Sequence, residues 1–244
     1  MNNNKREIFK QKINKDLELD FVTSDKAFLP TGTSGVLIEA VKDKIIPSGS
    51  LLDLGCGIGV VGISLAKLGK TTNPLYLSDA SEEAIKLTKQ NAANHNITVD
   101  SRVGSLYQPW LDMQFDYIID DVSGISEEIA KISPWFKNVP CASGIDGTDL
   151  VVSVLKEAPK YLKENGKIFF PVLSLSNGQR IIDTAKKNFK NVNLLIRKTW
   201  PLPKEMNNHL ETVRSLAKND IIEIEEKFGM IMWHTDIYEA NNKL

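Results

Sequence analysis

The stretch Ser50-Leu-Leu-Asp-Leu-Gly-Cys-Gly-Ile-Gly59 decides the fold class of this 244-residue chain. Its first half has the pattern of a short apolar strand, and three glycines at alternate positions follow that strand directly. The next segment, Val60 to Leu68, has the pattern of a helix that ends before Gly69. A strand that passes through a glycine turn into a helix is the beginning of a strand-helix-strand unit, from which parallel sheets are built.

Strands and helices alternate from this stretch toward the carboxyl end. Further strands are expected at residues 75–78, 98–103, 115–119, 167–173 and 192–198. Helices are expected at residues 34–46, 60–68, 81–94, 126–131, 151–162 and 179–188. Because parallel neighbours need crossover connections, the pattern predicts a doubly wound α/β domain, with a mostly parallel sheet between two layers of helices.

The two ends of the chain depart from this alternation. Residues 1–28 predict a short helix followed by an extended segment, which would form a separate cover on a domain of residues 29–244. Within that domain, a Trp-Pro-Leu-Pro break at residues 200–203 and a helix at 206–218 precede a final strand at 230–238. No clear crossover helix directly precedes this strand. We therefore expect an antiparallel last strand at the far side of the sheet, with residues 200–229 inserted ahead of it.

The composition narrows the class of protein. Hydrophobic residues make up 42% of the chain and charged residues 25%, which excludes wholesale disorder. The formal net charge of -1 provides no general attraction for nucleic acid. Two cysteines cannot form a disulfide framework or a four-thiolate zinc site, and no metal-ligand spacing is present. With no signal-peptide pattern or membrane-length apolar run, the expected location is the cytoplasm.

The glycine loop and an acid further along point to a ligand site. Glycines 55, 57 and 59 let backbone amides approach a ligand, and Asp79 follows the second strand at the distance of a ribose-binding carboxylate. Residues 57–62 also read as the GxGxxG motif of dinucleotide-binding enzymes, which would use Asp79 in the same way. Asp53, two residues before the loop, favours a cationic ligand part over a pyrophosphate.

With this loop and acid the chain resembles the class I S-adenosylmethionine-dependent methyltransferases, which have a Rossmann-like fold. In that family the loop holds the methionine part of S-adenosyl-L-methionine, the acid after the second strand holds the ribose, and the segment after the third strand adjoins the adenine. The resemblance implies cofactor contacts at Ser34, Asp53, Gly55, Gly57, Gly59, Asp79, Ala80, Ser105, Leu106 and Asp120.

Over roughly residues 28–198 the chain is similar to the HemK/PrmC glutamine methyltransferase group. The similarity includes Phe28-Leu-Pro-Thr-Gly-Thr-Ser-Gly-Val-Leu-Ile-Glu39 and Ser143-Gly-Ile-Asp-Gly-Thr-Asp-Leu150. Where that group has a catalytic Asn-Pro-Pro-Tyr loop, which pairs with an amide, this chain has Asp121-Val-Ser-Gly124. A carboxylate instead holds an ammonium or guanidinium, or removes a proton from a hydroxyl. Asp121 and Ser123 are the predicted catalytic residues, and the alternative is that Asp121 caps the helix near Ser126.

The acceptor is expected beside Asp121, at the carboxyl edge of the sheet. Three segments are candidates to close over it: the stretch before Pro30, residues 135–147, and the insertion at 200–229. The insertion is favoured, with Trp200 and His209 as acceptor contacts. The predicted function is methyl transfer to a protein side chain or small molecule, in preference to nucleic acid and without a membrane; the oligomeric state is not indicated. An inactive cofactor-binding protein and an NAD-dependent oxidoreductase are the alternatives.

Overall fold

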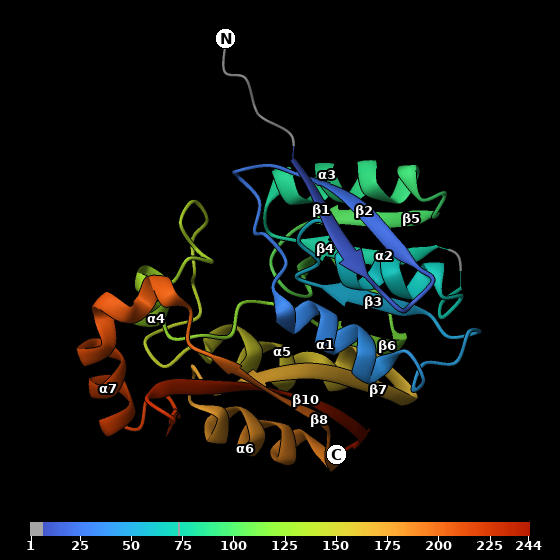
Figure 1. Cartoon of the computed structure of the whole chain (residues 1–244). Coiled ribbons are helices and arrows are strands. Elements are labelled where there is room, and N and C mark those ends of the chain that lie inside the picture. Colours follow the sequence, from blue (N-terminus) through green and yellow to red (C-terminus); the bar gives the residue numbers. More distant parts are fainter. Residues whose placement is uncertain (1–6, 73) are drawn as a thin grey trace.

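The structure, a computed structural model, describes residues 7–72 and 74–244 and has a central sheet with helices on both faces (Figure 1). The strand order is β5-β4-β3-β6-β7-β10-β8, with β9 paired to β10. The strands of this sheet are β3 (Leu51–Leu54), β4 (Leu75–Asp79), β5 (Val99–Val103), β6 (Phe115–Asp120), β7 (Leu162–Leu173), β8 (Phe189–Pro201), β9 (Glu225–Lys227) and β10 (Met230–Lys243). Strands β3 to β7 are mutually parallel. The predicted doubly wound, mostly parallel sheet is confirmed.

The two layers of helices follow from alternating side chains in the strands. Leu51 packs into a core with α1, α2 and α3, whereas the next residue, Leu52, packs into a core with α5 and α6. Successive side chains of a strand point to opposite faces, so each buried strand supplies both cores. The helices are α1 (Gly32–Val41), α2 (Val60–Lys67), α3 (Glu82–Asn94), α4 (Glu127–Ile132), α5 (Asp149–Tyr161), α6 (Gly178–Asn188) and α7 (Leu210–Lys218), with short turns η1 (Gln108–Trp110) and η2 (Lys204–His209).

The last strand is antiparallel, as predicted, but its position differs from the prediction. Strand β10 pairs antiparallel with β7 on one side and with β8 on the other, so it lies inside the sheet, and β8 forms the edge. The β8–β10 pairing extends from Phe189↔Lys243 to Pro201↔Met232. Trp200 therefore belongs to β8 and does not begin a separate insertion.

The amino-terminal segment is a hairpin, and the predicted helix there is wrong. Strands β1 (Glu7–Lys12) and β2 (Glu18–Thr23) pair antiparallel, with Phe9 opposite Phe21. The turn is stabilised by the side chain of Asn14, whose Oδ1 accepts the backbone N–H groups of Asp16 and Leu17 at 2.8 and 2.9 Å. The extended segment predicted after the helix is present as β2, whose Leu19 and Phe21 enter the core, whereas the residues predicted to be helical form β1.

Candidate active site

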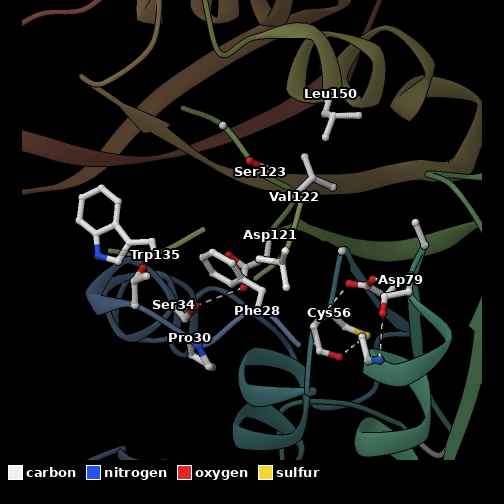
Figure 2. A pocket seen from close by; sticks show the side chains of 18 of the residues that line it. Phe28, Pro30, Ser34, Cys56, Asp79, Asp121, Val122, Ser123, Trp135 and Leu150 are labelled. Atoms are coloured by element: carbon white, nitrogen blue, oxygen red, sulfur yellow. Dashed lines mark hydrogen bonds between the residues drawn. The ribbon is translucent and has the colours of Figure 1, made fainter. Parts of the chain in front are cut away.

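A cavity of about 520 Å³ lies at the carboxyl ends of β3, β4 and β6. Its lining comes from the glycine loop after β3, residues 78–84, residues 104–106 after β5, and residues 121–125 after β6. Residues 26–34 and residues 135–142 also line it, together with Leu150, Pro171, Leu173 and Trp233. Figure 2 shows Asp79 on one side and Trp135 on the other, with Asp121 between them. The cavity therefore adjoins both the predicted cofactor loop and the predicted catalytic position.

The three glycines of the loop have different roles. All have positive φ, at 78° for Gly55, 54° for Gly57 and 86° for Gly59. A Cβ on Gly55 would lie 2.8 Å from Val122 Cγ1, so this glycine permits close contact with the loop after β6. A Cβ on Gly57 would meet nothing within 4 Å, and this residue lines the cavity. Gly59 is not among the lining residues and instead precedes the first turn of α2.

Asp79 lines the cavity and organises the backbone around it. Its Oδ2 accepts the Gly57 N–H at 2.9 Å, and its Oδ1 accepts the Ser81 N–H at 2.8 Å. Asp79 does not cap α3, because Ser81 Oγ accepts the Ala84 N–H in that role. Burial raises the pKa of Asp79, and the two backbone hydrogen bonds oppose the rise. Since each carboxylate oxygen has two lone pairs, both can accept a further hydroxyl donor from the cavity.

Asp53 lies outside the cavity lining, contrary to its predicted contact with a cationic ligand part. It is fully buried, and its Oδ2 accepts the Gly62 N–H of α2 at 2.8 Å. Burial raises the pKa of Asp53 to about 7. The reason for the difference is strand geometry: its side chain points toward α2 and fixes that helix against β3, while the loop that follows faces the cavity.

Asp120 and Asp121 point in different directions. Asp120 is fully buried and outside the lining, so its predicted cofactor contact is not present in this geometry. Its Oδ1 accepts the Val122 N–H at 3.2 Å, and burial raises its pKa to about 8. Asp121 lines the cavity, where its Oδ2 accepts the Ser34 hydroxyl at 3.3 Å. It does not cap α4, whose N-cap residue is Ser126.

The carboxyl of Asp121 is in a negative environment. Its pKa is raised well above the usual value, first by burial and then by the charges of Asp53, Asp120 and Asp79, whereas the Ser34 hydrogen bond opposes the rise. A carboxyl with a raised pKa is a stronger proton acceptor than an ordinary aspartate once it has ionised.

Ser123, the other predicted catalytic residue, also lines the cavity. Its hydroxyl lies 3.1 Å from Cys141 Sγ and 3.5 Å from Ser143 Oγ, and the Ser143 hydroxyl donates to the Ile125 carbonyl at 2.6 Å. These contacts join the loop after β6 to the loop that follows α4. Ser123 therefore connects two parts of the cavity wall.

The remaining predicted cofactor residues gather in the same cavity. Ala80 follows Asp79, and Ser105 and Leu106 follow β5, so all three line the wall around Asp79. Leu106 has a φ of 49°, a backbone conformation uncommon for leucine.

Trp200 and His209 do not reach the cavity, contrary to their predicted role. The Trp200 ring packs against Gly32 at the start of α1, where a Cβ would lie 2.9 Å from Cη2, and Trp200 Nε1 donates to Thr235 Oγ1 at 3.3 Å. His209 is exposed and precedes α7. The insertion fails to close the cavity because its apolar side chains pack into a third core with α4 and β10.

The other two candidate segments do line the cavity. Phe28 comes from the segment after β2, and Trp135 and Phe136 come from the loop after α4. The Phe28 and Phe136 ring centroids are 4.9 Å apart, so the two segments meet through these rings. Trp233 of β10 adds another ring, whose centroid lies 5.4 Å from that of Trp135; no sequence pattern singled out this residue. A signal for Trp135 and Phe136 was present, in two adjacent aromatic residues within a long loop.

Comparisons with known proteins find similar methyltransferases. The family model described as "Methyltransferase small domain" matches residues 26–121, which include the glycine loop and both cavity-lining aspartates. The release factor glutamine methyltransferase of Geobacter sulfurreducens is 28% identical over 156 residues, covering 61% of this chain and 54% of that protein. A ribosomal protein L11 methyltransferase of Thermosipho africanus is 28% identical over 163 residues, covering 67% of this chain and 49% of that protein.

Residues 26–121 match a methyltransferase small domain, and the chain is similar to the class I S-adenosylmethionine-dependent methyltransferases. Its curated relatives support the predicted resemblance to the HemK/PrmC-like group and S-adenosyl-L-methionine as the cofactor. The methyltransferase spans less than two thirds of the length of the first curated relatives.

Solved structures confirm the fold of the methyltransferase. A 16S rRNA methyltransferase of T. thermophilus, in complex with AdoMet and guanosine, superposes with a TM-score of 0.63 at 13% identity and covers 97% of this chain and 50% of that one. A ribosomal protein L11 methylase from Lactobacillus delbrueckii subsp. bulgaricus has a TM-score of 0.53 at 15% identity, and the match covers 88% of this chain and 81% of that one. Among the described residues, no helix has the length and apolar character to cross a membrane.

The cavity of the methyltransferase fits S-adenosylmethionine. Asp79 has free lone pairs for the two ribose hydroxyls. Gly57 has no side chain, so a ligand can come close to the backbone there. Ala80 and Leu106 line the cavity with apolar side chains that a planar base would contact. The carboxyls of Asp79 and Asp121 suit a ligand that carries a sulfonium and an ammonium.

Proposed function

We propose that this methyltransferase transfers the methyl group of S-adenosylmethionine to a protein side chain or a small molecule. The single observation that supports this most is one cavity in which the glycine loop and Asp79 lie beside Asp121 and the aromatic residues of two covering segments. Such a cavity can hold two ligands in contact. Holding two reactants in line is the main requirement of a methyl transfer.

Different residues bind the cofactor at one end of the cavity and the acceptor at the other. S-adenosylmethionine supplies a methyl group on a positively charged sulfur, which is open to attack by a nucleophile. Gly57, Asp79 and Leu106 hold and orient that ligand, and the aromatic residues exclude water from the acceptor end. Asp121, between the two ends, orients the nucleophile and accepts its proton.

The acceptor need not be the glutamine that is named for the curated relatives. Asp121-Val-Ser-Gly124 replaces the loop that pairs with an amide in the HemK/PrmC group. An ionised carboxylate accepts hydrogen bonds but cannot donate one to an amide carbonyl. Gly124 also provides no ring for packing on a planar group. These differences favour an acceptor with a proton to release.

Calorimetric titration and product analysis test the proposal. The purified chain is titrated with S-adenosylmethionine and with NAD, and then incubated with radiolabelled S-adenosylmethionine and a bacterial extract. We expect binding of S-adenosylmethionine, no binding of NAD, and labelled product with release of S-adenosylhomocysteine. Binding of NAD alone would support an oxidoreductase, whereas cofactor binding without labelled product in any fraction would support an inactive binding protein.

A further inference from the structure

The acceptor end of the cavity combines a carboxyl with aromatic walls. Asp121, Phe28, Trp135 and Phe136 all line this end of the cavity. Ring faces carry negative charge density and attract cations, more strongly where water is excluded. A carboxyl and several such rings in one cavity suit a positively charged group on an apolar body.

The balance of charge around Asp121 points the same way. Asp79 lines the same cavity, and the carboxyl groups of Asp53 and Asp120 are buried behind it. Lys26 is the single Lys, Arg or His among the residues that the structure places in the cavity lining. A carboxylate or phosphate in the acceptor would meet repulsion here, whereas an ammonium would supply the missing charge.

We propose that the acceptor is a small-molecule amine, whose ammonium form is held by Asp121 between the rings of Phe28, Trp135 and Phe136. This assignment rests on the proposed methyl transfer. The two covering segments meet through Phe28 and Phe136, so the acceptor end is bounded by contacting side chains and suits a small molecule better than a protein loop.

The proton and the methyl group move in a balanced sequence. The bound ammonium gives one proton to the ionised carboxylate of Asp121, which leaves a neutral amine with a free lone pair. The amine nitrogen then forms a bond to the methyl carbon while the carbon–sulfur bond breaks, and the electron pair of that bond remains on sulfur. The products are a methylated ammonium and S-adenosylhomocysteine, and Asp121 returns its proton to solvent after product release.

A chemical treatment that blocks amines tests the class of acceptor. A bacterial extract is separated into small molecules, proteins and nucleic acids, and half of the small-molecule fraction is acetylated, followed by mild hydrolysis of acetyl esters so that hydroxyls are restored. Each fraction is incubated with the full chain and radiolabelled S-adenosylmethionine. We expect labelled small molecules that are retained on a cation exchanger at pH 7, and at least a tenfold loss of label after acetylation.

The other outcomes separate this inference from the proposed function. Label confined to the protein or nucleic-acid fraction, or to small molecules that acetylation leaves unchanged, overturns the amine acceptor while methyl transfer stands. Absence of label in every fraction overturns both, even where calorimetry shows cofactor binding.

Two variants test the roles of individual residues on the labelled amine. Asp121→Asn is expected to lower kcat/KM at pH 7 at least tenfold and to recover activity toward pH 10, because the amine then loses its proton to solvent; the exposed Asp112→Asn is the control. Phe136→Leu is expected to raise KM at least threefold, and Phe136→Tyr to restore it. A pH-independent loss in Asp121→Asn, or equal KM values for Leu and Tyr at residue 136, contradicts the proposed roles.

Discussion

Replacing Asp120 by Asn is expected to stabilise the protein at pH 8 while leaving cofactor binding unchanged. Asp120 ends β6, is fully buried, and has a pKa raised to about 8 by that burial. Its Oδ1 accepts the Val122 N–H, whereas its Oδ2 is buried without a hydrogen-bond partner among the described residues. An asparagine has nearly the same shape, can accept the same N–H and never ionises.

The size of the effect follows from the two pKa values. In the unfolded chain Asp120 ionises near its ordinary pKa of 3.8, whereas in the folded protein it keeps its proton up to about pH 8. Between these values the folded state binds more protons, so the free energy of unfolding falls as pH rises, by about 1.4 kcal/mol per pH unit. From pH 5 to pH 8 this amounts to about 4 kcal/mol. The contribution is complete below the unfolded pKa and is lost on passing to the folded pKa.

Urea unfolding at pH 5, 6, 7 and 8 measures this difference. The free energy of unfolding of Asp120→Asn should exceed that of the wild type by a margin that grows by about 4 kcal/mol from pH 5 to pH 8. Asp53, with a pKa of about 7, adds its own pH-dependent fall to both proteins and cancels in the comparison. Asp112→Asn, which changes an exposed aspartate, should show no such trend.

Two results would refute this reasoning about Asp120. A difference between variant and wild type that is constant from pH 5 to pH 8 would mean that the residue is ionised throughout. A tenfold loss of S-adenosylmethionine affinity in the folded variant would show that Asp120 contributes to cofactor binding.

Three further substitutions test other contacts. Asp121→Ala should lower turnover at least about tenfold, which corresponds to a rise of about 1.4 kcal/mol in the activation free energy, while the cofactor affinity measured by calorimetry stays nearly unchanged. Full activity on the identified acceptor would show that Asp121 has no catalytic role. Asp79→Ala should weaken S-adenosylmethionine binding at least about tenfold, because the Gly57 and Ser81 N–H groups lose their acceptor, and unchanged affinity would contradict this. Asn91→Leu should lower the free energy of unfolding, measured in urea, by at least about 3 kcal/mol, because it leaves three backbone groups of the hairpin and glycine loop unpaired. A decrease below about 1 kcal/mol would show that these groups find other partners.

The part of the fold that was predictable depends on local pattern. The strand and glycine turn from Ser50 to Gly59, and the alternation that follows, arise from runs of apolar residues and turn residues that are close in sequence. Placing β10 between β7 and β8 required pairing between residues far apart, such as Asp236 with Val172 and with Arg197. Local pattern contains no information on which distant edge a strand will join.

The hairpin at the amino end shows how a tertiary contact overrides local spacing. Apolar residues between Ile8 and Leu17 suit a helix about as well as a strand. Residues 7–12 instead pair as β1 with β2, and Asn91 of α3 holds β2 in place: its side chain accepts the Val22 N–H at 2.7 Å and donates to the Val22 carbonyl at 3.0 Å. An asparagine 69 positions away is not visible as a partner from the sequence.

The sequence also did not predict in which direction each aspartate side chain near the site points. Asp53, Asp79, Asp120 and Asp121 all lie at or just beyond strand ends, so sequence position predicted all four near the ligand. The direction of each side chain separates them: Asp79 and Asp121 line the cavity, while Asp53 and Asp120 are buried behind it. Side-chain direction at a strand end depends on local twist and on nearby N–H donors such as Gly62 and Val122, which a sequence does not specify.

The segment at 200–229 affects the acceptor end indirectly. Met206 of η2 and Val213 of α7 are fully buried in the third core, which also includes Ile129 of α4 and Trp233 of β10. The loop after α4, which supplies Trp135 to the cavity, packs on the same core. An insertion that the sheet does not require therefore supports the loop that lines the acceptor end, and variation in its apolar residues would alter acceptor binding through the position of Trp135 while the glycine loop and Asp79 stay in place.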